Sequence, residues 1–276
     1  MTFTGVLKLG GGAGVQHAAA LANLAARVTM DERWVLVHGA SDAANRLAAE
    51  RGVPVRTLTT SSGHSSRYTD PETLAIFCEA AAMVNADMLA GLMSRGCLAV
   101  GYADAEIIRA ERKSALRAMV NGRQVIVRDD YSGTITGVDS ALLYDTLEEG
   151  MTPVIAPLAS GGELGRLNVD GDRAAAAIAR ALGADALVIL SNVPGLLRDV
   201  NDPRSLITGF DLSEIAHYET YAAGRMKKKL LAAREAMVER TILADSRVAR
   251  PLDAALNGAG TQIHHHGQLI LAGAAD

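Results

Sequence analysis

The sequence has few aromatic residues, few cysteines and only a small net charge. Phe, Trp and Tyr together make up 4% of its 276 residues. The two cysteines, Cys78 and Cys97, are too few for a disulfide scaffold and lack the spacing of metal ligands. A net charge of −4 argues against a general nucleic-acid-binding protein. No apolar run reaches about 18 residues and residues 1–14 do not resemble a signal peptide, so we expect a cytoplasmic protein without membrane contact.

The remaining composition is typical of a globular α/β protein. Apolar residues account for 49% of the chain and charged residues for 21%, and there are 27 glycines. A chain of this length buries roughly three quarters of the surface that it exposes when unfolded. Short β-rich runs alternate with longer helical patterns almost from end to end. Strands joined by crossover helices predict a mainly parallel sheet with helices on both faces, which is a three-layer αβα sandwich.

The boundaries of these elements follow from hydrophobic periodicity and from turn residues. The predicted strands cover residues 6–9, 34–37, 98–101, 152–155, 186–190 and 241–244. The predicted helices cover residues 16–28, 43–50, 71–95, 172–182 and 226–238. Two β-hairpins are predicted, over residues 53–66 and, around Asn121-Gly122, over residues 115–127. From Ile263 onward we expect a loosely held tail, in which the adjacent His264, His265 and His266 do not converge on a metal ion.

Two glycine turns follow the first two predicted strands. The first is Lys8-Leu9-Gly10-Gly11-Gly12 and the second is His38-Gly39-Ala40-Ser41. Ligands of open α/β sheets bind beyond the carboxyl ends of the strands, where glycine lets the backbone approach a phosphate group. The turns therefore predict two neighbouring phosphate-binding sites. The alternative is a pair of ordinary turns, the second of which leads into a helix capped by Ser41 or Asp42.

Two further motifs open helices with charged residues. Asn168-Val169-Asp170-Gly171-Asp172 brings acidic residues to a helix start, where Asp172 interacts favourably with the helix dipole. Gly224-Arg225-Met226-Lys227-Lys228-Lys229 brings cations to such a position, which the dipole disfavours. A bound anion would explain these lysines, and a solvated basic face is the alternative.

Together with two other runs, these motifs resemble those of the amino acid kinases, and more narrowly of the acetylglutamate kinase branch. In chain order the runs are Lys8-Leu9-Gly10-Gly11, His38-Gly39, residues 66–70, 168–172, 191–195 and 224–229. The resemblance covers about residues 6–263. The run 63–70 is similar to that of kinases acting on aminoadipate or glutamate attached to an amino-group carrier protein of the LysW type. Relatives usually carry glycine where Ala40 stands, and Gly101-Tyr102-Ala103-Asp104 also departs from their pattern.

The resemblance implies a kinase that transfers a phosphoryl group from ATP to a side-chain carboxylate, with Mg²⁺ bridging the β- and γ-phosphates and no dedicated protein ligands for the metal. It implies one amino acid kinase domain over residues 1–276. An acceptor half would reach to about residue 157, an ATP-binding half would cover residues 158–263, and a loose tail would cover residues 264–276. A homodimer is also implied, formed through the predicted helix 71–95.

The resemblance also implies roles for particular residues. Lys8 would contact the transferring phosphoryl group, Lys229 would stabilise the leaving side, and Asp172 would hold both ammonium groups. Backbone N–H groups of Gly10, Gly11 and Gly39 would bind phosphoryl oxygens. The acceptor site would comprise Gly39, Ala40, Arg67 and Asn168. The ATP site would comprise Gly10, Gly11, Ser191, Asn192, Val193, Gly195, Leu196 and Lys229.

The distribution of charge bears on the acceptor. Residues 107–128 contain six basic residues and a single acidic one, Glu111, in a chain that is acidic overall. The basic residues are Arg109, Arg112, Lys113, Arg117, Arg123 and Arg128. Such a patch would steer a small acidic carrier protein to the active site. A solvated hairpin face is the alternative explanation.

Three functions remain open at this point. The first is a kinase for carrier-linked aminoadipate (or glutamate), in lysine or arginine biosynthesis. The second is a kinase for free N-acetylglutamate, which differs in needing no carrier. The third is a catalytically silent regulator that binds ligands on the same scaffold. The presence of Lys8, Asp172 and Lys229 together favours the two enzymes.

Overall fold

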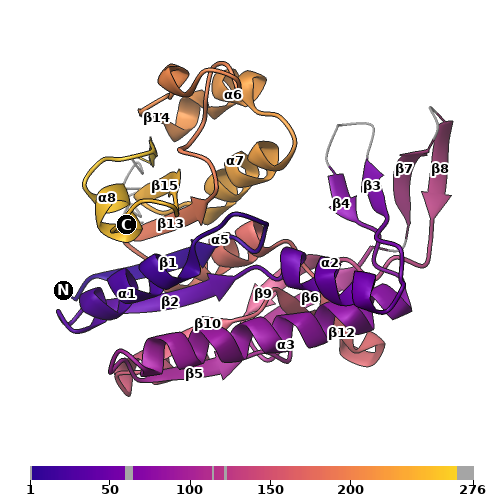
Figure 1. Cartoon of the computed structure of the whole chain (residues 1–276), viewed down its shortest axis with the longest axis horizontal. Helices are drawn as coiled ribbons and strands as arrows, with labels where there is room; N and C mark the ends of the chain where they lie inside the picture. The colour runs from indigo at the N-terminus through magenta and orange to yellow at the C-terminus, as the bar shows by residue number, and fades with distance from the viewer. Residues whose placement is uncertain (1, 60–64, 114, 121–122, 266–276) are drawn as a thin grey trace, which may run out of the picture.

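The largest element of the fold is an eight-stranded sheet in the order β14-β16-β15-β13-β1-β2-β10-β5. The computed structural model describes residues 2–59, 65–113, 115–120 and 123–265 (Figure 1). The strands of this sheet are β1 (Thr4–Leu9), β2 (Arg33–His38), β5 (Ala99–Tyr102), β10 (Thr152–Ile155), β13 (Ala186–Ser191), β14 (Gly209–Asp211), β15 (Arg240–Asp245) and β16 (Thr261–His264). Neighbouring strands are parallel except for β15 and β16. The predicted mainly parallel sheet is confirmed.

Helices cover both faces of this sheet. One face packs against α1 (His17–Val28), α3 (Pro71–Met93) and α8 (Pro251–Leu256). The opposite face packs against α4 (Ser140–Glu148), α5 (Gly171–Leu182) and α7 (Arg225–Ala236). Along β1, Leu7 and Leu9 belong to the first core and Val6 to the second, as expected for a strand buried on both faces. The structure therefore has the predicted three layers.

Two hairpins and a small sheet lie at one side of the main sheet. The antiparallel pairs β3 (Thr57–Thr59) with β4 (Ser65–Arg67) and β7 (Leu116–Val120) with β8 (Arg123–Val127) confirm the two predicted hairpins within the described residues. Residues 60–64 and 121–122, which include the turn sequence Asn121-Gly122 and the motif residues Gly63 and His64, lie outside them. The hairpins project side by side from the body, and β3 packs beside β7 (Figure 1). The small sheet comprises β6 (Ile108–Arg112), β9 (Gly133–Val138), β11 (Leu158–Ser160) and β12 (Arg166–Asn168).

The start of α2 (Ser41–Glu50) differs from the prediction. Ala40 occupies the N-cap position, and no side chain caps this helix, so the helix does not have the Ser41 or Asp42 cap of the alternative interpretation. The Asp42 N–H donates instead to the Gly11 carbonyl at 2.7 Å, which ties the helix start to the first glycine turn. Ala40 has φ −129°, so its backbone does not require glycine there.

The predicted tail from Ile263 is wrong at its beginning. Ile263 is 2% exposed and lies in β16, where it pairs with Phe210 of β14 and Thr241 of β15. His264 is the last residue of the same strand, and the His265 N–H donates to the Glu239 carbonyl. Residues 266–276, including His266, lie outside the described residues. Strand β16 was missed because its short, mixed sequence lacks the alternation of a half-buried strand.

Among the described helices, α3 alone is long and apolar enough to cross a membrane, judged by length and composition only. The same properties are common in core helices of soluble proteins, and Ile76, Phe77 and Leu92 of α3 are buried within the protein's own core. Met83 and Met93 of α3 are more than half exposed. The helix therefore has one face covered by this chain and another that is not.

Candidate active site

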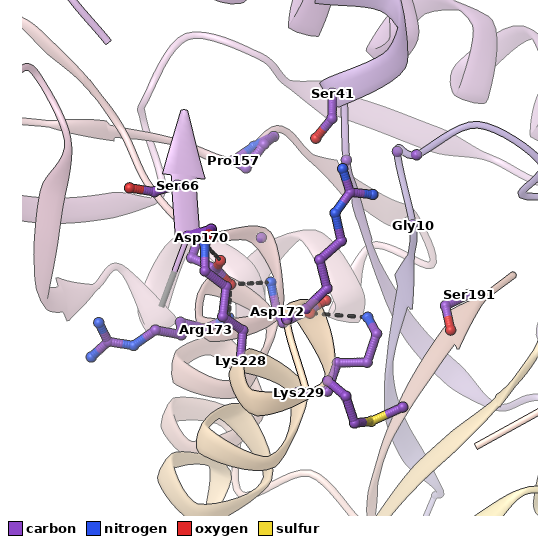
Figure 2. Close-up of a pocket in the computed structure, with 18 of the residues that line it drawn as sticks. Gly10, Ser41, Ser66, Pro157, Asp170, Asp172, Arg173, Ser191, Lys228 and Lys229 are labelled. Carbon is purple, nitrogen blue, oxygen red and sulfur yellow. Dashed lines mark hydrogen bonds and ion pairs between the residues drawn. The ribbon is translucent and has the colours of Figure 1, made fainter. Parts of the chain in front are cut away.

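A carboxylate lies between two buried ammonium groups at the carboxyl end of β1. Asp172 Oδ1 is 2.7 Å from Lys8 Nζ, and Asp172 Oδ2 is 3.0 Å from Lys229 Nζ. Each of the three residues is only 7% exposed. Figure 2 shows Asp172 and Lys229 meeting, with Asp170 and Lys228 beside them. The structure thus brings together the three residues predicted to be catalytic from three distant parts of the chain.

Local structure fixes where each of these side chains lies. Lys8 falls on the face of β1 that carries Val6, and this face packs against α5. Asp170 caps α5 by accepting hydrogen bonds from the backbone N–H groups of Asp172 and Arg173, which places Asp172 in the first turn. Gly224 precedes α7 with φ +52°, a conformation that favours glycine.

The cluster has an excess of positive charge, which favours binding of an anion. Burial alone would raise the pKa of Asp172, but Lys229 and Lys8 more than offset it and hold that pKa well below its usual range. Burial lowers the pKa of Lys229, an effect that Asp172 opposes and Lys8 reinforces. Two buried cations share one carboxylate, so an anion beside them would relieve their repulsion.

The two glycine turns are in direct backbone contact. A Cβ on Gly11 would lie 2.1 Å from the Gly39 carbonyl carbon and 2.4 Å from the Ala40 nitrogen. The N–H groups of Gly10 and Gly39 donate to the Leu190 and Leu9 carbonyls, so the prediction that they bind phosphoryl oxygens is wrong. Within the described part of the chain, the N–H groups of Gly11, Gly12 and Ala40 have no hydrogen-bond acceptor. These groups, rather than those of Gly10 and Gly39, are available to an anion.

A cavity of about 770 Å³ connects the cluster with the other predicted site residues. All the residues assigned from the resemblance line it, namely Lys8, Gly10, Gly11, Gly39, Ala40, Arg67, Asn168, Asp172, Ser191, Asn192, Val193, Gly195, Leu196 and Lys229. The Gly195 turn lies against Thr261, whose hydroxyl accepts from the Leu196 N–H at 2.8 Å. Such a volume accommodates a nucleotide-sized ligand.

Arg67 and Asn168 lie in the cavity without engaging a carboxylate. The Arg67 guanidinium donates to the Ser41 carbonyl at 3.1 Å and to the Asn45 side chain. Asn168 Nδ2 donates to Thr69 Oγ1 at 3.0 Å. Burial lowers the pKa of Arg67, and the nearby Arg225 lowers it further. The acceptor end of the cavity therefore presents polar donors and positive charge.

Arg225 is a cavity residue to which the sequence analysis gave no role. A Cβ on Gly12 would lie 2.7 Å from Arg225 Nη1, so this guanidinium sits against the first glycine turn. No ion pair of Arg225 occurs within the described residues. Its position at the start of α7, just after Gly224, was the available signal.

Two members of the basic patch, Arg112 and Lys113, are half-buried rather than exposed. Arg112 stacks over the Tyr131 ring at 4.0 Å and donates to the Asp130 and Arg128 carbonyls, so it joins β6 to residues 128–131. Lys113 lines the cavity. Arg109, Arg117 and Arg128 are exposed, as predicted, and the side chain of Arg123 lies outside the described part of the structure.

Comparison with known proteins gives the class that this fold and site define. The Amino acid kinase family matches residues 4–244, and the chain belongs to that family.

The names of its relatives specify a narrower activity within this family. Over 264 residues the chain is 41% identical to the LysW-aminoadipate kinase of Deinococcus radiodurans, covering 94% of this chain and 90% of that protein. It is 38% identical to the LysW-aminoadipate kinase of Thermus thermophilus, with 94% and 99% covered. It is 32% identical to a putative LysW-aminoadipate/LysW-glutamate kinase of Nitrosopumilus maritimus, with 91% and 94% covered.

Solved structures share the fold at lower identity. N-acetylglutamate synthase from Neisseria gonorrhoeae superposes with a TM-score of 0.78 at 24% identity, covering 96% of this chain and 60% of the synthase. Carbamate kinase from Giardia lamblia superposes with a TM-score of 0.68 at 16% identity, covering 96% of this chain and 99% of that kinase. These similarities show the amino acid kinase fold.

Proposed function

We propose that this chain transfers the γ-phosphoryl group of ATP to the side-chain carboxylate of 2-aminoadipate whose amino group is linked to a small acidic carrier protein of the LysW type. The product would be an acyl phosphate in lysine biosynthesis. The observation that carries the reaction class is the buried Lys8–Asp172–Lys229 cluster beside two open glycine turns. The names of the relatives support the choice of acceptor.

The reaction needs alignment and charge neutralisation rather than a protein nucleophile. A carboxylate oxygen of the acceptor forms a bond to the γ-phosphorus while the bond from that phosphorus to the bridging oxygen of ADP breaks. Lys8 stabilises the charge on the transferring group and Lys229 the charge on the leaving oxygen. Asp172, hydrogen-bonded or ion-paired to both, keeps the two ammonium groups at a fixed separation. Its lowered pKa keeps it ionised for this role.

Backbone and polar groups bind the remaining parts of the two substrates. The N–H groups of Gly11, Gly12 and Ala40 hold phosphoryl oxygens, as in an oxyanion hole. Arg67 and Asn168 hold the acceptor, beside the turn formed by Gly39 and Ala40. The turn of residues 191–196 lies against the base and ribose, and its members Ser191, Asn192, Val193, Gly195 and Leu196 line the cavity.

Magnesium would enter with the nucleotide. Within the described residues, no group of three or more His, Cys, Asp or Glu side chains is arranged to hold a metal ion. We expect Mg²⁺ to be coordinated by phosphate oxygens and water, which is how this ion commonly binds in kinases. When bound, Mg²⁺ would neutralise phosphate charge that Lys8 and Lys229 do not reach.

The test is a coupled assay of ADP release with three acceptors in parallel: carrier-linked aminoadipate, carrier-linked glutamate and free N-acetylglutamate. We expect the highest kcat/KM with carrier-linked aminoadipate. Efficient turnover of carrier-linked glutamate would extend the activity toward arginine biosynthesis, as the name of the Nitrosopumilus maritimus relative suggests. Preference for free N-acetylglutamate would overturn the carrier requirement. Nucleotide binding without turnover of any acceptor would identify a silent regulator.

A further inference from the structure

Lys113 and Ser132 lie together in the cavity, and the proposed reaction assigns neither of them a role. Both line the cavity, and the Lys113 N–H donates to the Ser132 carbonyl at 3.2 Å. Ser132 also forms a β-bridge with Asn168, which places the pair at the acceptor end of the cavity. The glycine turns and the turn of residues 191–196 line the same cavity.

The side-chain ammonium of Lys113 and the side-chain hydroxyl of Ser132 have no hydrogen-bond or ion-pair partner within the described part of the chain. The Ser132 hydroxyl is buried and makes no hydrogen bond there. Lys113 is half-buried and forms no ion pair there. A buried hydroxyl without a partner costs free energy, and so does an ammonium group partly removed from water. A ligand that accepts hydrogen bonds and carries negative charge would remove both costs.

The neighbouring cations are already neutralised. Lys228 Nζ lies 3.0 Å from Asp170 Oδ2, and Arg173 forms two hydrogen bonds to the Glu235 carboxylate, at 2.7 and 2.6 Å. Lys113 therefore differs from the cations around it. Burial lowers the pKa of Lys113, Arg173 and Lys228 lower it further, and Asp130 and Asp170 act in the opposite direction.

Asp130 does not serve as the missing partner. It is 1% exposed, and its two oxygens accept from the backbone N–H groups of Thr69 and Ser132 at 2.9 and 2.8 Å. These bonds hold Ser132 in place and join the β3–β4 hairpin region to the segment before β9. The carboxylate thus organises the pocket wall, and the Lys113 ammonium remains available to a ligand.

We propose that Lys113 and Ser132 form a carboxylate subsite that binds a second, non-reacting carboxylate of the carrier-linked acceptor. This rests on the proposed function, because the acceptor must carry such a group. Two sources offer it: the α-carboxylate of the amino acid, and a carboxylate of the carrier beside the linkage. The chemistry is the same for both, a charge-assisted pair with the ammonium and a hydrogen bond from the hydroxyl.

The first test compares Lys113→Met with the wild type and with Lys113→Arg. For Lys113→Met we expect KM for carrier-linked aminoadipate to rise at least about tenfold, the usual effect of losing one charge-assisted hydrogen bond, with KM for ATP unchanged within about twofold. For Lys113→Arg, which keeps the positive charge, we expect KM for carrier-linked aminoadipate to stay much closer to the wild-type value. Lys227→Met is the matched control, since Lys227 does not line the cavity, and it leaves both constants near the wild-type values.

The second test separates the two sources of the carboxylate with free N-acetyl-aminoadipate, which has the α-carboxylate and no carrier. Its binding is measured as KM, or as an inhibition constant where it is not turned over. If Lys113→Met weakens both ligands, the subsite binds the α-carboxylate. If it weakens only the carrier-linked acceptor, the subsite binds the carrier. Ser132→Ala should weaken the same ligand by a smaller factor.

The subsite is overturned if Lys113→Met leaves KM unchanged for both ligands, or if it raises KM for ATP as much as KM for the acceptor. These outcomes differ from failure of the proposed function, in which the wild-type enzyme itself does not turn over the carrier-linked acceptor. Circular dichroism and the unfolding midpoint of each variant establish that it is folded.

Discussion

At the scale of single residues, the site depends on one carboxylate shared by two buried ammonium groups. Removing one partner of a buried ion pair commonly costs about 3–5 kcal/mol when it leaves an uncompensated charge. Here Asp172 keeps a second cation when either Lys8 or Lys229 is replaced. A substitution at either lysine therefore changes the chemistry with less risk to folding than a substitution at Asp172.

Replacing Lys229 by alanine is expected to lower kcat by roughly a hundredfold or more, the usual scale for losing a preorganised electrostatic group. Lys227→Ala is the control, because Lys227 does not line the cavity, and it should have little effect. Lys228 is unsuitable as a control, because it forms an ion pair with Asp170, the residue that caps α5. Steady-state kinetics in which Lys227→Ala is as damaging as Lys229→Ala would contradict the assignment of Lys229.

His38 provides a prediction on stability. Its ring is fully buried, and burial lowers its pKa from 6.5 to about 4. Asn85 Nδ2 lies 3.1 Å from His38 Nε2 and also donates to the Val154 carbonyl, so Nε2 acts as the acceptor in the neutral ring. Between these pH values the unfolded chain binds a proton here that the native chain does not, so stability falls as the pH falls.

The free energy of unfolding should therefore decrease by on the order of 3 kcal/mol between pH 6.5 and pH 4 through His38 alone. Urea denaturation across this range measures the effect. His38→Gln should remove most of the slope in this window, because glutamine has no proton to bind. Equal slopes for the two proteins would show that His38 does not control this transition.

At the scale of elements, the carboxyl ends of β1 and β2 determine the geometry of the site. The two strands are parallel neighbours, so the glycine turns that follow them meet. Gly11 touches backbone of the second turn, whereas Gly12 approaches only the end of the Arg225 side chain. The two glycines therefore differ in what an added methyl group would displace.

Gly11→Ala should destabilise the protein by at least about 2 kcal/mol, since overpacking against backbone has no flexible neighbour to absorb it. The free energy of unfolding of Gly12→Ala should lie within about 1 kcal/mol of the wild-type value, because only the Arg225 guanidinium must move. Thermal and urea unfolding of the two variants compare them directly. Similar stabilities would mean that the turns are not rigidly packed.

Two exposed members of the basic patch lie on or next to the β7–β8 hairpin: Arg117 in β7 and Arg128 directly after β8. Arg117→Glu combined with Arg128→Glu should raise KM for the carrier-linked acceptor severalfold and leave KM for ATP nearly unchanged. Added salt should weaken the wild-type interaction more than that of the variant, because exposed charges are screened beyond about 8 Å at physiological ionic strength. An unchanged KM at low salt would remove this hairpin from carrier docking. Arg112 is unsuitable for the test because it packs on Tyr131.

At the scale of the whole molecule, α3 offers a surface for a second copy of the chain. Met83 and Met93 are 55% and 59% exposed on a helix whose other side is buried in the core. We predict a homodimer formed through this helix, and multi-angle light scattering should give about twice the chain mass of 28.8 kDa. Met83→Glu with Met93→Glu should shift the protein toward monomer. A wild-type monomer at micromolar concentration would contradict the prediction.

The sequence alone determined the sheet type, both hairpins and a set of residues that the fold brings together in one cavity. These depend on local signals: apolar strands between helices, an Asn-Gly sequence, and glycine motifs that can be recognised from their order along the chain. Prediction from the sequence failed where residues far along the chain determine whether a segment forms a strand. Strand β16 exists because β14 and β15 offer backbone partners on both of its sides.

Only the tertiary structure decided how the polar groups of the site are used. The N–H groups of Gly10 and Gly39 are consumed by strand carbonyls, while those of Gly11, Gly12 and Ala40 remain available. Arg112 and Lys113 are adjacent in sequence, yet Arg112 packs on the Tyr131 ring and Lys113 lines the cavity. The reason is physical: a hydrogen bond or an ion pair requires particular atoms within about 3 Å, and residue type and order do not specify that distance.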